Sequence, residues 1–243
     1  MKIVATIEAR MTSSRLPGKV LMKILDKPIL HYLVARLKQV ELIDEIVLAT
    51  TVNSQDNNLI EFANNENIKY YRGSEDDVML RVFEAAKSVD ADLIVEITGD
   101  CPIIDYNIIE QAIQTYINNK VDYVSNAHVR SYPDGMDVQV FSVNLLEKSL
   151  NMTDDILDHE HVTLHIRNHP ELFSHLNLVA PKKLWWPELG LTLDEKSDFE
   201  LLKKIIEHFK DDLFFNCYEI IDFLRKNPRL LSINQKIVRR HDT

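Results

Sequence analysis

A cationic, hydroxyl-rich segment follows the first apolar run of the chain. Residues 9–19 read Ala-Arg-Met-Thr-Ser-Ser-Arg-Leu-Pro-Gly-Lys, with three basic side chains, three hydroxyl side chains and no acid. Guanidinium and ammonium groups donate charge-assisted hydrogen bonds to phosphate oxygens, and hydroxyl and backbone N–H groups can donate others. The segment therefore indicates binding of a small phosphate-bearing anion, the alternative being a solvated surface loop.

Two aspartates follow apolar runs farther along the chain. Asp100 comes shortly after the run Leu-Ile-Val-Glu-Ile at 93–97, and Asp194 ends the run Leu-Thr-Leu-Asp. Mg²⁺ binds proteins through one or two carboxylates and takes its other ligands from substrate phosphates and water. Together with the cationic segment the pair predicts a magnesium site, although either aspartate alone is typical of a helix cap or a turn.

The histidines, cysteines and glycines give weaker indications of function. His161, His165 and His169 recur at four-residue intervals, a spacing that can bind zinc, but the glutamate of an H-E-x-x-H motif is missing. Surface histidines are the preferred interpretation, with His161 a candidate substrate contact. Cys101 has no evident base in the sequence, so covalent catalysis is not expected. The five glycines form neither a dinucleotide-binding nor a P-loop pattern.

The elements that must position these residues alternate in the first half of the chain. Short β-branched runs predict strands at residues 2–7, 45–50, 68–71, 93–97 and 123–125. Amphipathic stretches predict helices at residues 28–40, 56–66, 74–88 and 105–118. This alternation predicts an α/β fold whose mostly parallel sheet is covered on both faces. The cationic segment then lies at a strand's carboxyl end, where open parallel sheets bind ligands.

The pattern changes after residue 126. Further strands are expected at 136–141, 174–179 and 189–193, and further helices at 142–150, 156–168, 197–209 and 217–227. No linker or internal repeat divides the chain, so we predict a single domain over residues 1–243. Within it, residues 127–187 are expected to form an insertion-like lobe for substrate binding and dimerisation, and residues 211–243 a C-terminal helical tail.

Composition and charge exclude several classes of protein. A chain of 243 residues, 45% apolar and 27% charged, can bury a core without a disulfide or structural metal. With 28 basic and 38 acidic side chains the net charge is −10, which argues against a nucleic-acid partner. Residues 1–40 alone carry eight basic and two acidic side chains, so the positive excess is local. Two cysteines and no long apolar stretch predict a soluble cytoplasmic protein with no membrane partner.

Five motifs resemble those of a known family. They read I-E-A-R-M-T-S-S-R-L-P-G-K-V-L, T-G-D-C-P, Y-P-D-G-M-D-V, H-E-H-V-T and L-T-L-D. They are similar to the cytidylyltransferases of the acylneuraminate and spore-coat polysaccharide type and, more distantly, to the CMP-Kdo synthetases. The resemblance spans residues 1 to about 210. It implies a three-layer, Rossmann-like nucleotidyltransferase fold with a mixed sheet, a homodimer, and transfer of CMP from CTP to an acidic sugar with Mg²⁺ and release of pyrophosphate.

The resemblance also implies roles for individual residues. The nucleotide would be bound by Ala9, Arg10, Ser13, Ser14, Arg15, Lys19, Arg81 and Asp100. The catalytic set would be Arg15, Lys19, Asp100 and Asp194, with the two aspartates as the Mg²⁺ ligands. The acceptor side would be lined by Gly135, Asp137, Glu160 and His161.

Two departures leave the acceptor open. Glu8 stands where the family commonly has glutamine, and no second catalytic aspartate of the kind found in some sialate-activating members is evident after Asp194. The alternatives are a sugar-phosphate nucleotidyltransferase that uses another nucleoside triphosphate, and a non-catalytic nucleotide-binding protein of the same fold. The presence of both Asp100 and Asp194 disfavours the non-catalytic alternative.

Overall fold

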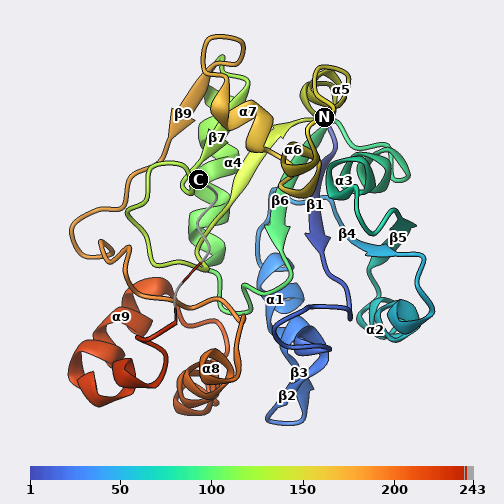
Figure 1. Cartoon of the computed structure of the whole chain (residues 1–243). Coiled ribbons are helices and arrows are strands. Elements are labelled where there is room, and N and C mark those ends of the chain that lie inside the picture. The colour runs from blue at the N-terminus through green and yellow to red at the C-terminus, as the bar shows by residue number, and fades with distance from the viewer. Residues whose placement is uncertain (238, 240–243) are drawn as a thin grey trace.

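A mixed β-sheet forms the centre of the molecule (Figure 1). The structure, a computed structural model, describes residues 1–237 and residue 239. In this part of the chain the sheet has seven strands, in the order β5 (Lys69–Gly73), β4 (Glu45–Thr51), β1 (Ile3–Glu8), β6 (Leu93–Thr98), β8 (Gln139–Ser142), β7 (Tyr123–Ser125) and β9 (His175–Asn177). The first four strands run parallel, and β8 pairs antiparallel with both of its neighbours.

Strand register brings the carboxyl ends of three strands to one edge. Glu8, the last residue of β1, lies opposite Ala49 of β4 and Thr98 of β6. The cationic segment after β1 and Asp100 after β6 therefore leave the sheet at the same level. This confirms the expected α/β architecture and the position of the cationic segment at the carboxyl ends of the strands.

Helices cover both faces of the sheet, giving three layers (Figure 1). One face packs against α1 (Ile29–Leu37), α2 (Asn57–Glu66), α4 (Tyr106–Asn118), α8 (Lys196–His208) and α9 (Cys217–Lys226). The other packs against α3 (Val78–Lys87) and α5 (Val143–Leu150). Alternate residues of β1 point to opposite faces of the sheet. Ile3, Ala5 and Ile7 pack in the core on the face covered by α1, and Val4 packs on the face covered by α3. The strand is buried on both faces, which explains its continuous apolar sequence.

One hairpin was missed and two local predictions were wrong. A hairpin of β2 (Lys23–Ile24) and β3 (Lys27–Pro28) was not expected, because its turn residues Leu25 and Asp26 take φ of 48° and 61° without the usual Asn-Gly signal. The helix expected at 156–168 is two short helices, α6 (Ile156–Glu160) and α7 (Leu164–Asn168), since Val162 at φ 23° interrupts the helical conformation between them. Residues 189–193 form no regular strand but only an isolated bridge between Asp134 and Gly190.

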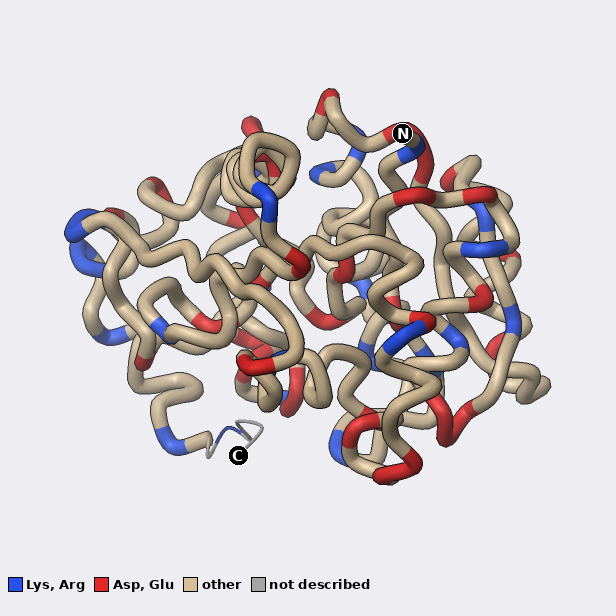
Figure 2. Tube along the Cα trace, turned by 90° about the horizontal axis from the view of Figure 1, so that it is seen from above, with Lys and Arg blue, Asp and Glu red and all other residues tan. Residues whose placement is uncertain are grey.

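The later segments pack against the same sheet. Residues 127–187 contain β8, which lies between β6 and β7, together with α5, α6, α7 and the edge strand β9. Helix α9 and the 3₁₀ helix η3 (Pro228–Ile233) follow α8, and both α8 and α9 contact η3. Acidic and basic residues are spread along the whole trace (Figure 2). Over the described residues, no helix has the length and apolar character needed to cross a membrane.

Candidate active site

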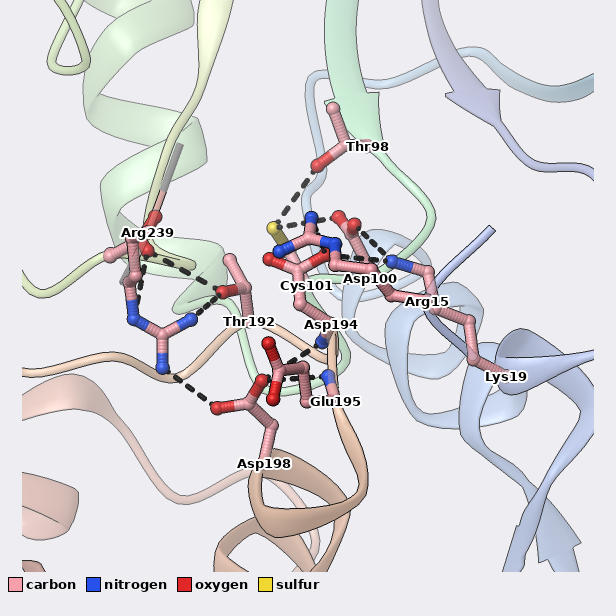
Figure 3. Close-up of polar contacts among 11 residues, drawn as sticks. Arg15, Lys19, Thr98, Asp100, Cys101, Thr192, Asp194, Glu195, Asp198 and Arg239 are labelled. Atoms are coloured by element: carbon pink, nitrogen blue, oxygen red, sulfur yellow. Dashed lines mark hydrogen bonds and ion pairs between the residues drawn. The ribbon is translucent and has the colours of Figure 1, made fainter. Parts of the chain in front are cut away.

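Four of the predicted residues meet at the carboxyl edge of the sheet (Figure 3). The Lys19 Nζ lies 2.8 Å from Asp100 Oδ2 and 3.1 Å from Asp194 Oδ1. A guanidinium nitrogen of Arg15 lies 2.8 Å from the same Asp194 oxygen. The two cations come from the segment after β1, Asp100 from the segment after β6, and Asp194 from the segment before α8. Three distant parts of the chain therefore build one cluster of two cations and two carboxylates.

Two glycines allow this close approach. Gly18 has φ of 72°, the left-handed region that glycine adopts without strain, and its N–H donates to the Met11 carbonyl at 2.9 Å. The cationic segment is thereby folded back just before Lys19. At Gly99 a Cβ would lie 2.7 Å from the Glu8 carbonyl oxygen, so only glycine lets the chain leave β6 this close to β1.

Hydrogen bonds between backbones hold the two aspartates near each other. The Leu193 N–H donates to the Asp100 carbonyl at 2.9 Å, which joins the two carboxylate-bearing segments directly. The Asp194 N–H donates to Asp198 Oδ2 at 3.1 Å. The position of the Asp194 side chain is therefore set by its flanking backbone as well as by Lys19 and Arg15.

The charges of this cluster support one another. Burial acts to lower the pKa of Lys19, but attraction by Asp100 and Asp194 outweighs it and raises that pKa above its ordinary value. Burial likewise acts to raise the pKa of Asp100, and the Lys19 ammonium reverses the shift to a lowered pKa. Lys19 and Asp100 are therefore both charged near neutral pH.

The donor set fits a hard cation. Asp100 and Asp194 both offer carboxylate oxygens. Among the described residues no group of three or more His, Cys, Asp or Glu could enclose a metal ion by itself. Two carboxylates with other ligands supplied by phosphate and water suit Mg²⁺, which binds proteins in this way. The Lys19 ammonium now lies within hydrogen-bond distance of both Asp100 and Asp194. A cation shared by the two carboxylates would therefore displace it.

Arg10 and Arg81 lie in a second cluster, around Glu75. The Glu75 carboxylate accepts hydrogen bonds from Thr12 Oγ1 at 2.6 Å and from Asn53 Nδ2 at 2.5 Å, and an Arg10 guanidinium nitrogen lies 3.4 Å away. These hydroxyl and amide donors lower the pKa of Glu75. Arg81 donates to the Glu75 carbonyl at 3.3 Å. Glu75 was not predicted from the sequence, because nothing in its local acidic run indicates contact with a segment some 65 residues earlier.

The remaining nucleotide-side residues are spread along the segment. Ala9 is buried, and its N–H donates to the Ala49 carbonyl at 3.3 Å, so it continues the pairing of β1 with β4. Ser13 is half-buried and Ser14 is exposed. The structure thus presents hydroxyl groups on the cationic segment at the strand edge.

Gly135 and Asp137 are two of the residues expected to line the acceptor site, and their loop approaches the segment that carries Asp194. Gly135 has φ of 100°, and a Cβ there would lie 2.8 Å from the Leu191 carbonyl carbon, so this loop packs tightly against the segment before Asp194. Burial, reinforced by Asp134, raises the pKa of Asp137 to about 7. Glu160 is exposed at the end of α6 and His161 follows it, half-buried.

Cys101 and the other histidines have local partners. The Cys101 thiol is buried 3.2 Å from Thr98 Oγ1, and burial raises its pKa well above the ordinary value, which disfavours the nucleophilic thiolate. His165 lies 3.3 Å from an Asp158 oxygen, and His169 lies 2.8 Å from a Glu171 oxygen.

Asp137 leads to a prediction about pH. A carboxyl group whose pKa is higher in the folded state than in the unfolded chain favours folding at low pH, and this contribution disappears as pH rises from about 4 to about 7. Asp137→Asn removes the titration. Relative to wild type, its stability should therefore improve by about 2–3 kcal/mol between pH 5 and pH 8, or roughly 5–10 °C in Tm. Thermal unfolding of both proteins across this range measures the change, and parallel curves would contradict it.

Comparisons with known proteins identify the family of this chain. A family model described as cytidylyltransferase matches residues 4–237. The spore coat polysaccharide biosynthesis protein SpsF of Bacillus subtilis is 32% identical over 232 residues, which cover 93% of this chain and 95% of that protein. A 3-deoxy-manno-octulosonate cytidylyltransferase of Geobacter metallireducens is 34% identical over 113 residues, covering 46% of this chain and 44% of that protein. The structure of a cytidylyltransferase from Leptospira borgpetersenii superposes with a TM-score of 0.91 at 31% identity, covering 99% of this chain and 100% of that one.

The family model, SpsF and the Leptospira structure each match nearly the whole chain, including the cationic segment and the segments that carry the two carboxylates. The chain belongs to the cytidylyltransferase family. Its resemblance to the spore-coat and CMP-Kdo enzymes and its nucleotidyltransferase fold are thereby confirmed, and it is a CTP-dependent nucleotidyltransferase.

Proposed function

We propose that this protein transfers CMP from CTP to an acidic sugar in the synthesis of a surface polysaccharide precursor, with Mg²⁺ as its cofactor. The observation that carries the proposal is the cluster in which Lys19 contacts Asp100 and Asp194 beside Arg15. The acidic-sugar acceptor is supported by the relatives, because SpsF is named for spore coat polysaccharide and the Geobacter protein for 3-deoxy-manno-octulosonate.

The geometry suits an in-line displacement. A hydroxyl oxygen of the acceptor forms a bond to the α-phosphorus, the bond from that phosphorus to pyrophosphate breaks, and the hydroxyl proton passes to water. Arg15 and Lys19 bind the phosphate oxygens of the leaving group and offset the charge that develops on them. Asp100 and Asp194 would hold Mg²⁺, which supplies further positive charge to the phosphates. The scaffold contributes positioning, since the mechanism requires no covalent intermediate.

The other proposed residues divide between the two substrates. Arg10, Arg81 and the serines of the cationic segment would complete the nucleotide site around the first cluster. Gly135, Asp137, Glu160 and His161 would line the acceptor site.

The proposal extends to the oligomeric state of the protein and its location in the cell. We propose a homodimer formed through residues 127–187, which is supported by the exposed apolar side chains of Met152, Ile156 and Leu157. A cytoplasmic location is supported by the use of CTP and by the free, buried thiols of Cys101 and Cys217.

A comparison of the four nucleoside triphosphates tests this function. A ligand that binds only the folded state at 100 times its Kd stabilises it by about 2.7 kcal/mol, so CTP with Mg²⁺ should raise Tm by roughly 5–10 °C. ATP, GTP and UTP at the same concentration should raise it far less. Pyrophosphate release from CTP with a panel of sugar acids and sugar phosphates then identifies the acceptor. Equal shifts with all four nucleotides, or release with sugar phosphates alone, would contradict the proposal.

A further inference from the structure

Arg239 joins two segments beside the carboxylate cluster, residues 192–198 and the loop of Asp134 (Figure 3). One guanidinium nitrogen donates to Thr192 Oγ1 at 2.6 Å and a second donates to Asp198 Oδ1 at 2.7 Å. The third, Nε, lies 3.4 Å from Asp134 Oδ2. The side chain is only 11% exposed, although it comes from the segment after the last helix. All three guanidinium nitrogens are thus engaged with the chain around Asp194.

Asp198 transmits this contact to Asp194. Its side chain is fully buried, and its Oδ2 accepts hydrogen bonds from the backbone N–H groups of Asp194 at 3.1 Å and Glu195 at 2.9 Å. Its Oδ1 accepts from Arg239 and from Asn234 Nδ2, the latter at 2.9 Å. Because both oxygens are used, the carboxylate is fixed in rotation as well as in position.

The negative charges of Asp198 and Asp134 favour an arginine at position 239. A buried carboxylate is strongly unfavourable unless a counter-charge and hydrogen bonds compensate it. Asp198 lies beside the segment that carries Asp194, and Asp134 also faces this region. Arg239 supplies positive charge to Asp198 and Asp134 together, and its planar fork matches several oxygens at once in a way that a lysine cannot.

Gly190 provides the space for the guanidinium. A Cβ at this position would lie 1.8 Å from the Arg239 Nη2 and 2.0 Å from its Cζ, and no other group is as close. The φ of Gly190 is outside the left-handed region, so alanine is compatible with its backbone. Gly190→Ala therefore displaces Arg239 while leaving Asp198, Thr192 and Asp134 in the sequence.

We propose that Arg239 is a positioning residue for Asp194: through Asp198 it fixes the backbone that carries this carboxylate, and through Asp134 it ties the acceptor-side loop to the same segment. The inference rests on the proposed role of Asp194 as a metal ligand. Arg239 touches neither substrate in this scheme, and its effect is exerted only through the segment from Thr192 to Asp198.

Three variants and one control test the proposal. Arg239→Ala removes the guanidinium, Gly190→Ala displaces it, and Arg239→Lys keeps the charge without the fork. Lys236→Ala, an exposed neighbour in the same segment, serves as the control. The first measurement is amide hydrogen exchange over residues 191–198 of the metal-free proteins. Arg239→Ala and Gly190→Ala should each speed exchange about tenfold, the factor expected for loss of one charge-assisted hydrogen bond. The exchange rate of Arg239→Lys should lie between those of these two variants and wild type, and the rate of Lys236→Ala should match wild type.

The second measurement is turnover as a function of Mg²⁺ concentration. In the Arg239→Ala and Gly190→Ala variants the Mg²⁺ concentration for half-maximal rate should rise about tenfold, with the KM for CTP at saturating Mg²⁺ within about twofold of wild type. The double variant should resemble either single one, because both remove the same contact.

A purely structural arginine would behave differently. It would lower Tm in Arg239→Ala while leaving exchange at residues 191–198 and the Mg²⁺ dependence unchanged, and this result would overturn the proposal. Full activity in Arg239→Lys would overturn the role assigned to the fork. Faster exchange in a protein that turns over no CTP would support the positional link while refuting the proposed function, so the two failures are distinguishable.

Discussion

Asp100→Asn and Asp194→Asn are each expected to lower kcat with CTP by at least about a hundredfold while the protein folds normally. Asparagine keeps the size of the side chain but removes the negative charge that holds a hard cation. A hundredfold loss corresponds to about 2.7 kcal/mol of transition-state stabilisation. Both carboxylates contact the same Lys19 ammonium, so they act as a unit and the double variant should be scarcely worse than either single one.

The measurement is pyrophosphate release at saturating CTP, with circular dichroism and thermal unfolding to check the fold. Asp211→Asn is a matched control, because this aspartate is exposed and lies outside both clusters. Replacing Mg²⁺ by Mn²⁺ should restore part of the rate in the two site variants. Near-normal turnover by either variant with a proven acceptor would show that these aspartates only shape their loops.

Lys19→Ala should have two separable effects. Without the ammonium, the phosphates lose a charge-assisted contact, and kcat/KM for CTP should fall by about 10- to 100-fold. The carboxylates of Asp100 and Asp194 also lose the cation between them. Breaking a partly buried ion pair by removing one partner is destabilising, so the metal-free variant should unfold several degrees below wild type. Added Mg²⁺ should recover more Tm in the variant than in wild type, because it replaces the missing positive charge.

Arg15→Ala provides the comparison within the site. Its guanidinium pairs with Asp194 and its side chain is one-third exposed, so CTP use should weaken while the metal-free stability changes little. Lys23→Ala, an exposed lysine in the hairpin, should change neither quantity. Unchanged steady-state constants for CTP in both Lys19→Ala and Arg15→Ala would refute the phosphate-binding role of the segment.

The sequence was sufficient to predict the parts that depend on local pattern. The apolar run before Ala9 is buried on both faces, so its strand and the cationic loop after it could be located, and the same holds for Asp100. Strand register then explains why these two segments meet, since parallel strands bring their carboxyl ends to one edge. Asp194 was identified by its place after an apolar run, although that run forms no regular strand.

The parts that were missed depend on contacts between distant residues. Arg239 lies 41 residues from Asp198, and no pattern in either segment indicates that they pair. Leu25 and Asp26 adopt positive φ without the residue types that favour it, so the hairpin has no sequence signal. Glu75 organises Arg10 and Asn53 from another loop, which residue spacing cannot reveal.

The central position of β1 has a consequence for how the protein folds. The first strand of the chain pairs with β4 and, across some 90 residues, with β6, so half of its partners are synthesised much later. Long-range parallel pairing requires closure of large loops and is slow. We expect β1, β4 and β5 with their helices to associate first, forming a nascent half-sheet that carries the cationic loop but not Asp100 or Asp194. The ability to retain CTP together with its metal would then appear only after β6 has docked, which makes ligand retention a kinetic marker for closure of the sheet.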